Sequence, residues 1–281
     1  VLGNFSEQAA QCEAALYLSR EVKSDKEEVG ILTDLGEMED LRGHYEEAKD
    51  RFDAGKRIAQ RLGDSESQGK LLSHLGWVFA HQGDFRQARD TWKAALALAK
   101  AAHDRINEAF CCSTLAWVHD RWGECTVADR YFEEGVAINN DLGSPYVKTG
   151  LFTNRGAALI HRGNYDEAER FLRISWDIDK FSGHAERAGV TLENLGIIEA
   201  RCGNLKGAEA YLGQRQEGEL KERGSALATF MGEAAFIQGE IFRIESADSS
   251  ARNCYQRAKE HLRKGLDQAT QLLNPERQAV A

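Results

Sequence analysis

RGHYEEA at residues 42–48 is the stretch that decides the fold, because the chain repeats it at a constant spacing. Close copies are QGDFRQA at 82–88 and RGNYDEA at 162–168, and looser copies are WGECTVA at 122–128 and CGNLKGA at 202–208. The second letter is a glycine that recurs every 40 residues, at positions 3, 43, 83, 123, 163 and 203. A fixed period of this length predicts a protein built from stacked structural repeats.

Each period is predicted to form two helices, because only two prolines interrupt 281 residues. The first helix carries a small residue at Gly36, Gly76, Ala116, Gly156, Gly196 and Gly239. The second carries an alanine twelve positions later, at 48, 88, 128, 168, 208 and 251. A bulky residue follows that alanine by four, at Phe52, Trp92, Phe132, Leu172, Leu212 and Tyr255. Small and bulky residues at these spacings favour closely packed antiparallel helices with one buried face.

Residues that favour helix ends lie where this pairing places the ends of the helices. Gly63, Gly143 and Gly183 follow predicted helices, where a left-handed backbone conformation ends a helix. Ser24, Asp64, Asp104 and Ser144 precede predicted helices and are good N-caps. A seventh copy of the repeated word, ESADSSA at 245–251, fits if three residues are inserted after Leu205.

The predicted fold is all-α, a right-handed superhelical solenoid of antiparallel helix pairs that spans residues 1–281. Its segments are an orphan second helix at 1–24, full repeats at 25–64, 65–104, 105–144, 145–184 and 185–224, and an irregular terminal repeat at 225–281. The chain begins at Val1 within a repeat, so we expect further sequence before it.

Composition excludes several classes of function. A formal net charge of −9 disfavours nucleic-acid binding, and no apolar run is long enough for a membrane span. The six cysteines form no C-x-x-C pair, which together with the lack of a signal peptide favours reduced thiols in the cytoplasm. Nucleotide-loop, zinc-hydrolase and nucleophile-elbow motifs are missing, so we expect no enzyme activity, no metal and no cofactor.

The sequence resembles the tetratricopeptide repeat family. The residues that carry the resemblance are Leu72, Leu75, Gly76, Ala88, Trp92 and Ala95, with the corresponding set in the preceding repeat. A 40-residue period resembles the long-helix variant found in bacterial signal-transduction (STAND-type) NTPases, maltose-activator-like regulators and Leu-Gly-Asn scaffold proteins. The resemblance implies a binding surface rather than a particular partner. Cys125 and Arg215 depart from the family pattern, in place of an aromatic and a small residue.

The first helices of such a solenoid line its concave groove, so rows at fixed offsets from the small residue are candidates for a binding site. The candidates are Trp77, Trp117, Phe110, Tyr146, His74, Thr114, Asn154, Asn194, His81, Arg121, His161 and Arg201. The two tryptophans could anchor a ligand or pack against the adjacent helix, and the asparagines could read a peptide backbone or bond between repeats. The arginines could hold a carboxylate or phosphate or be solvated charges.

The row that bears lysine in chaperone-binding members of the family reads Thr33, Ser73, Ser113, Thr153 and Glu193, which disfavours chaperone C-terminal tails. The leading hypothesis is therefore a non-enzymatic sensor module of a larger bacterial signalling protein. Its groove would bind a peptide, protein or small effector, and an NTPase or effector domain would lie elsewhere in the parent chain. The alternative is a scaffold or self-assembly module that associates through its uncapped ends and convex face.

Overall fold

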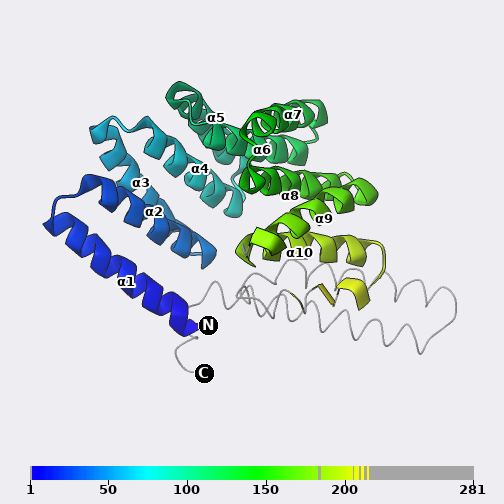
Figure 1. Ribbon diagram of the computed structural model, residues 1–281, viewed down its shortest axis with the longest axis horizontal. Coiled ribbons are helices and arrows are strands. Elements are labelled where there is room, and N and C mark those ends of the chain that lie inside the picture. Colours follow the sequence, from blue (N-terminus) through cyan, green and yellow to red (C-terminus); the bar gives the residue numbers. More distant parts are fainter. Residues whose placement is uncertain (1, 183–184, 205, 209, 212–213, 215–281) are drawn as a thin grey trace. The chain divides into compact units, whose positions relative to one another are not determined.

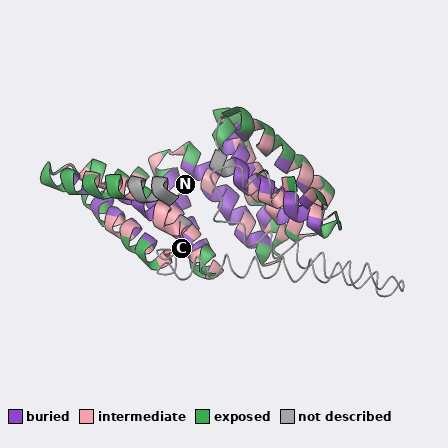
Figure 2. Ribbon diagram, turned by 90° about the horizontal axis from the view of Figure 1, so that it is seen from below, coloured by how far each residue is buried: buried purple, intermediate pink, exposed green. Residues whose placement is uncertain are grey.

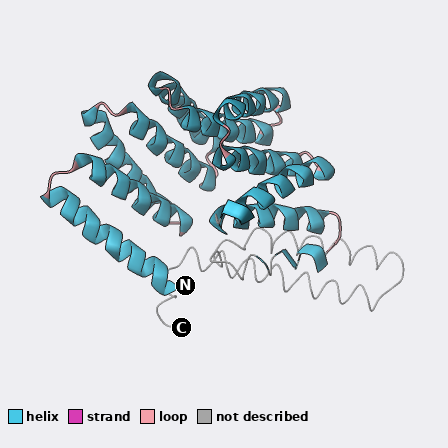
Figure 3. Cartoon of the chain, in the orientation of Figure 1, coloured by secondary structure: helices cyan, strands magenta, loops and turns pink. Residues whose placement is uncertain are grey.

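A computed structural model describes residues 2–182, 185–204, 206–208, 210–211 and 214 of the chain. Every regular element in these ranges is an α-helix (Figures 1 and 3). The predictions for Gly183, Leu212, Arg215 and Gly239 and for residues 225–281, including the word at 245–251, lie outside the described residues.

The helices follow one another through short turns. They are α1 (Leu2–Glu21), α2 (Asp25–Leu41), α3 (Tyr45–Leu62), α4 (Ser65–His81), α5 (Phe85–Ala102), α6 (Arg105–Arg121), α7 (Cys125–Leu142), α8 (Pro145–His161), α9 (Tyr165–Ser182) and α10 (Ala185–Arg201). The chain divides into two compact units, Val1–Asn154 and Arg155–Ala281. Each unit is described by itself below.

The turns use the conformations that the repeated glycines predict. Gly43, Gly83 and Gly123, which join the two helices of successive repeats, have φ angles of 79°, 82° and 74°. Gly63 and Gly143 end α3 and α7 in the left-handed region, as predicted, with φ angles of 68° and 62°. An L-residue is strained in this region, which is why glycine recurs there.

The predicted N-caps behave unequally. Asp64 and Asp104 accept hydrogen bonds from the backbone N–H groups of Ser67 and Asn107, each at 3.0 Å. The Ser144 hydroxyl accepts a longer bond, 3.3 Å, from the backbone N–H of Val147. Ser24 makes no side-chain capping bond, although it precedes α2 as predicted.

The small residues of the first helices lie against the bulky residues of the second helices. A methyl group placed on Gly36 would come within 2.5 Å of the Phe52 ring, and one on Gly76 would overlap the Trp92 ring even more closely. In the second unit, a methyl group on Gly156 would lie 2.5 Å from Leu172. The absence of a side chain at these positions is therefore what lets each helix pair close.

A second set of glycines joins successive repeats of the first unit. Gly55 on α3 contacts Leu71 on α4, and Gly135 on α7 contacts Leu151 on α8, with distances from an added methyl group of 3.2 and 2.6 Å. Buried residues accordingly line the sides of helices that face their neighbours (Figure 2). In the first unit the buried clusters run from one repeat into the next, so stability depends on stacking.

Candidate functional site

One side of the first helices in the first unit stays accessible. On α4 it is formed by Lys70, His74, Trp77 and His81, spaced by four, three and four residues, whereas Leu71, Leu75 and Val78 on the same helix are buried. Helix α4 contacts both α2 and α6. We call the accessible side of α2, α4 and α6 the first-helix face.

Two tryptophans stand next to each other on this face. The ring centroids of Trp77 and Trp117 are 5.5 Å apart, and both side chains are half-buried. The fully buried Trp92 of α5 presents its edge to both rings, at 5.3 and 6.3 Å with interplanar angles of 74° and 82°. Trp92 is itself fixed, since its indole N–H donates to the Ser73 carbonyl oxygen at 3.0 Å. The outer indoles therefore rest on a rigid aromatic base.

Arg121 completes this cluster at the end of α6. Its guanidinium carbon lies 5.2 Å from the Trp117 ring centroid and 5.0 Å from that of Phe85, the first residue of α5. Both distances are within the range of a cation–π interaction. The exposed Arg121 side chain is thereby held against two rings, and it forms no ion pair with any residue that the structure describes.

His81 lies on the other side of Trp77. The two rings are stacked with centroids 5.8 Å apart, and the ring of Tyr45 lies 5.9 Å from the imidazole. His81 Nδ1 also lies 2.8 Å from a carboxylate oxygen of Asp40 on α2. The Tyr45–His81 and Phe85–Arg121 contacts are the same contact one repeat apart: the aromatic first residue of a second helix supports the last residue of the next first helix.

His74 sits deeper on the same face. Its ring stacks on the buried Phe52 with centroids 5.4 Å apart, and Nε2 lies 3.2 Å from a carboxylate oxygen of Glu37. Glu37 is half exposed, so water screens its attraction for an imidazolium. Desolvation by burial outweighs the attraction of Asp40, and it lowers the pKa of His74 from 6.5 to about 4. His74 is therefore neutral at pH 7.

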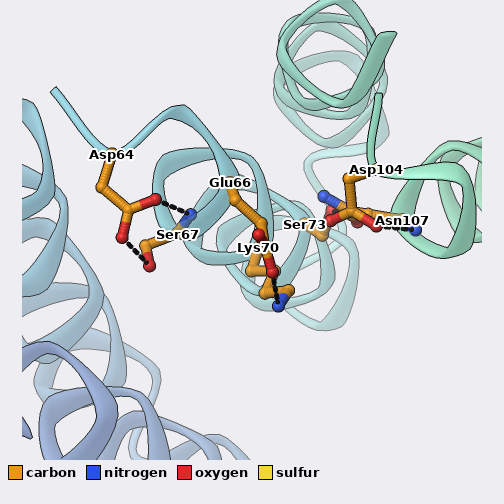
Figure 4. Close-up of polar contacts among 7 residues, drawn as sticks. All are labelled: Asp64, Glu66, Ser67, Lys70, Ser73, Asp104 and Asn107. Atoms are coloured by element: carbon orange, nitrogen blue, oxygen red, sulfur yellow. Dashed lines mark hydrogen bonds and ion pairs between the residues drawn. The ribbon is translucent and has the colours of Figure 1, made fainter. Parts of the chain in front are cut away.

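The beginning of α4 and α6 contributes polar contacts within the protein (Figure 4). Lys70 donates to Glu66 at 2.5 Å, and that bond raises the pKa of Lys70. Beneath it, the Ser73 hydroxyl lies 3.0 Å from the side-chain oxygen of Asn107, a buried link between α4 and α6 (Figure 4). These groups bind one another, which leaves the region around Trp77 and Arg121 as the part of the face best suited to a ligand.

The other predicted residues of the first unit are placed less favourably. Thr114 is fully buried and its hydroxyl donates to the Cys111 carbonyl at 3.1 Å, so it is not on the surface at all. The Asn154 amide donates to the Ser113 hydroxyl at 2.9 Å, which is the inter-repeat bond left open as an alternative above. Phe110 is half-buried and Tyr146 is exposed.

Three predicted residues belong to the second unit. His161 and Arg201 are exposed there, and the Asn194 amide donates to the Val190 carbonyl of its own helix at 3.0 Å. They belong to a different unit from the cluster around Trp77. We therefore restrict the candidate site to the first unit.

The site depends on residues that the groove rows did not include. Phe85 was missed, although its aromatic position in the repeated word at 82–88 was a signal that could have found it. Trp92 was predicted only as a core residue, and its role as the base of the two outer indoles follows from the geometry.

Metal-ligating and thiol side chains elsewhere among the described residues are the other candidate sites. No group of three or more His, Cys, Asp or Glu residues there could hold a metal ion. Burial raises the pKa of the Cys111 thiol to about 12 and raises that of Cys112 as well, which suppresses their nucleophilic thiolate forms. No described helix has the length and apolar character needed to cross a bilayer.

Stacked helix pairs with this packing define a helical-repeat protein. Models of the tetratricopeptide repeat match residues 27–101 and 67–141, and a further model matches residues 151–173. These parts of the chain are tetratricopeptide repeats. The sequence has no significant match among curated proteins.

Solved structures share the all-helical arrangement. The Rap conjugation regulator of plasmid pLS20, in complex with the Phr* peptide, has a TM-score of 0.66 and 14% identity, covering 97% of this chain and 72% of that one. A Rap protein complexed with competence and sporulation factor gives 0.62 and 14%, covering 87% and 78%. Apo RapI gives 0.61 and 12%, covering 92% and 91%. At these identities the likeness establishes the fold: a tetratricopeptide-like array of packed helix pairs, as the sequence predicts.

Proposed function

We propose that the chain is a non-catalytic binding module whose first-helix face takes a peptide segment at Trp77 and Trp117. The observation that carries the proposal is the pair of half-exposed indoles, 5.5 Å apart, on the buried Trp92. A rigid aromatic surface binds apolar side chains at low entropic cost, and such residues are typical energetic centres of interfaces. Two of the similar structures carry partners named as a peptide and a factor.

The larger role follows from the family resemblance. We propose that the module acts as a sensor within a longer bacterial signalling protein, where an NTPase or effector domain would respond to the bound peptide. Binding across α4 and α6 would stabilise one arrangement of these two repeats, and coupling needs such a difference in affinity between two states.

The test is a screen of immobilised random hexapeptides against the whole chain, followed by titration of the strongest peptide with tryptophan fluorescence as the readout. Trp77→Ala and Trp117→Ala should each weaken binding at least tenfold, since a central aromatic side chain contributes about 2 kcal/mol or more. Phe181→Ala, which removes an exposed ring in the second unit, is the matched control and should leave the affinity unchanged. Full affinity in both tryptophan variants would remove the peptide from this face.

Self-assembly is the second candidate, because α1 exposes a hydrophobic surface. Tyr17 and Leu18 on that helix are 65% and 60% exposed, and Val22, in the turn directly after it, is 70% exposed. Apolar side chains gathered in this way are typical of association sites. If the chain associates through α1, its mass in sedimentation should rise with concentration, and Tyr17→Lys with Leu18→Lys should abolish the rise. A concentration-independent monomer would exclude this function.

A further inference from the structure

Arg121 is one of four arginines of the first unit, with Arg57, Arg86 and Arg130, that have no carboxylate within 4.0 Å among the described residues, and its guanidinium lies against two aromatic rings. In the first unit Arg20, Arg42, Arg51, Arg61, Arg89 and Arg105 each pair with a carboxylate within 4.0 Å. Arg121 has no such partner among the described residues, although the chain carries nine more acids than bases. An arginine in so acidic a protein that remains unpaired and yet ordered by two rings is prepared to bind an anion from outside.

The two rings limit how that anion would bind. The Phe85 and Trp117 rings, inclined at 66° to each other, have their centroids 5.0 and 5.2 Å from the guanidinium carbon and restrict where the guanidinium can lie. A planar guanidinium matches a carboxylate through two parallel hydrogen bonds, and stacking reduces the entropy lost when these bonds form. Arg89 shows the satisfied form of the same arrangement: it lies 4.9 Å from the Trp122 ring, and its Nε and Nη2 lie 2.8 Å from Asp90.

The acidic residues on the same face indicate which class of anion Arg121 would bind. Asp40 and Glu37 stand on the far side of Trp77, on α2, where they bind His81 and His74. Phosphate is doubly charged and is usually bound by a cluster of arginines, whereas this face offers one unpaired guanidinium among acids. A single carboxylate is therefore the better match.

We infer, resting on the proposed function, that the bound peptide presents a carboxylate to Arg121 beside an apolar side chain on the indoles. Arg121 lies 5.2 Å from Trp117, which lies 5.5 Å from Trp77. Side chains two residues apart in an extended peptide are on the same side and about 7 Å apart. The motif recognised is an aromatic or large apolar residue, one spacer residue, and an acid, supplied by a Glu or Asp side chain or by the C-terminus of the peptide.

The experiment uses three synthetic probes and the whole chain. The probes are Ac-Phe-Gly-Glu-NH2, its neutral analogue Ac-Phe-Gly-Gln-NH2, and Ac-Phe-Gly-Gln-OH, whose one charge is the C-terminal carboxylate. Binding is followed by the shifts of the Trp77 and Trp117 indole N–H signals in two-dimensional NMR. At least one charged probe should bind about tenfold more tightly than the neutral probe, as one charge-assisted hydrogen-bond pair provides. Which charged probe prevails identifies the source of the carboxylate.

Variants of the chain distinguish a failure of the carboxylate inference from a failure of the proposed peptide-binding function. Arg121→Gln should make all three probes equal, Arg121→Lys should restore part of the preference, and Arg89→Gln, a stacked arginine already paired with Asp90, should leave it intact. If all three probes bind the wild-type chain equally, and Trp117→Ala weakens them all, the carboxylate inference is wrong and the aromatic site stands. If no probe shifts either indole signal, both are overturned.

Discussion

The two sides of helix α4 obey different rules. On its inner side Gly76 is in contact with Trp92, so closely that even one methyl group would not fit. On its outer side, one residue further on, Trp77 is half-exposed and contacts other rings at centroid distances above 5 Å. Close packing ties the identity of an inner residue to its neighbours, whereas an outer residue can change without disturbing the fold.

This difference shows which positions of a repeat protein can carry a binding function. The inner positions are fixed by the need to stack one repeat on the next, so they are alike in every period. The outer positions are under no such demand, and here they change from Glu37 to Trp77 and Trp117 at the same place in successive repeats. Substitutions on the two sides should therefore differ in what they damage.

The largest effect should come from a substitution of Trp92, which contacts both the inner residue Gly76 and the outer residue Trp77 of α4. Trp92→Ala removes a fully buried ring and leaves the Ser73 carbonyl without its donor, so the free energy of unfolding should fall by about 3–5 kcal/mol. Chemical denaturation of the whole chain measures this loss. Trp92→Phe keeps a ring beneath the outer indoles and should cost less. Equal and small losses in both variants would contradict the account of the aromatic base.

Gly76→Ala should have the next largest effect and should lower the free energy of unfolding. A Gly→Ala substitution at an open helical site should raise it. The new methyl group would overlap Trp92, and overpacking costs about 1–3 kcal/mol beyond the gain in helix propensity. Gly30→Ala on α2 is the matched control, since nothing lies within 4 Å of an added methyl group there. That variant should be more stable than wild type by up to about 1 kcal/mol. Thermal unfolding of both variants measures these two changes in stability.

The fold was predictable because the inner side repeats. The 40-residue glycine spacing, the small residues and the bulky residues sixteen positions later recur in every period, and Gly36–Phe52, Gly76–Trp92 and Gly156–Leu172 meet as this pattern requires. The pattern reports geometry shared by all periods, which is why one sequence suffices to detect it.

The site was predictable only in part, because contacts between side chains are not periodic. The row offsets selected Trp77, His81 and Arg121, which lie at half-buried or exposed positions. The same offsets also selected Thr114, which lies 0% exposed because α6 is more deeply buried than α4 at that offset. Nothing in the spacing indicated that Arg121 would lie against Phe85, since that contact joins the second helix of one repeat to the first helix of the next.

The smallest effect concerns His74, on the outer side, and appears only when the pH changes. Burial lowers its pKa from 6.5 to about 4, so between these values the unfolded chain binds a proton that the folded chain does not. Stability is therefore lost as the pH falls from 6.5 towards 4 and is fully present above 6.5. The side chain is one third exposed, so the loss should be smaller than that of the inner substitutions.

His74→Phe preserves stacking on Phe52 without a titratable group, and its unfolding free energy should fall less steeply with acid than that of wild type. Parallel pH profiles of the two proteins, with an imidazole signal that titrates near pH 6.5, would show that His74 is solvated rather than buried against Phe52.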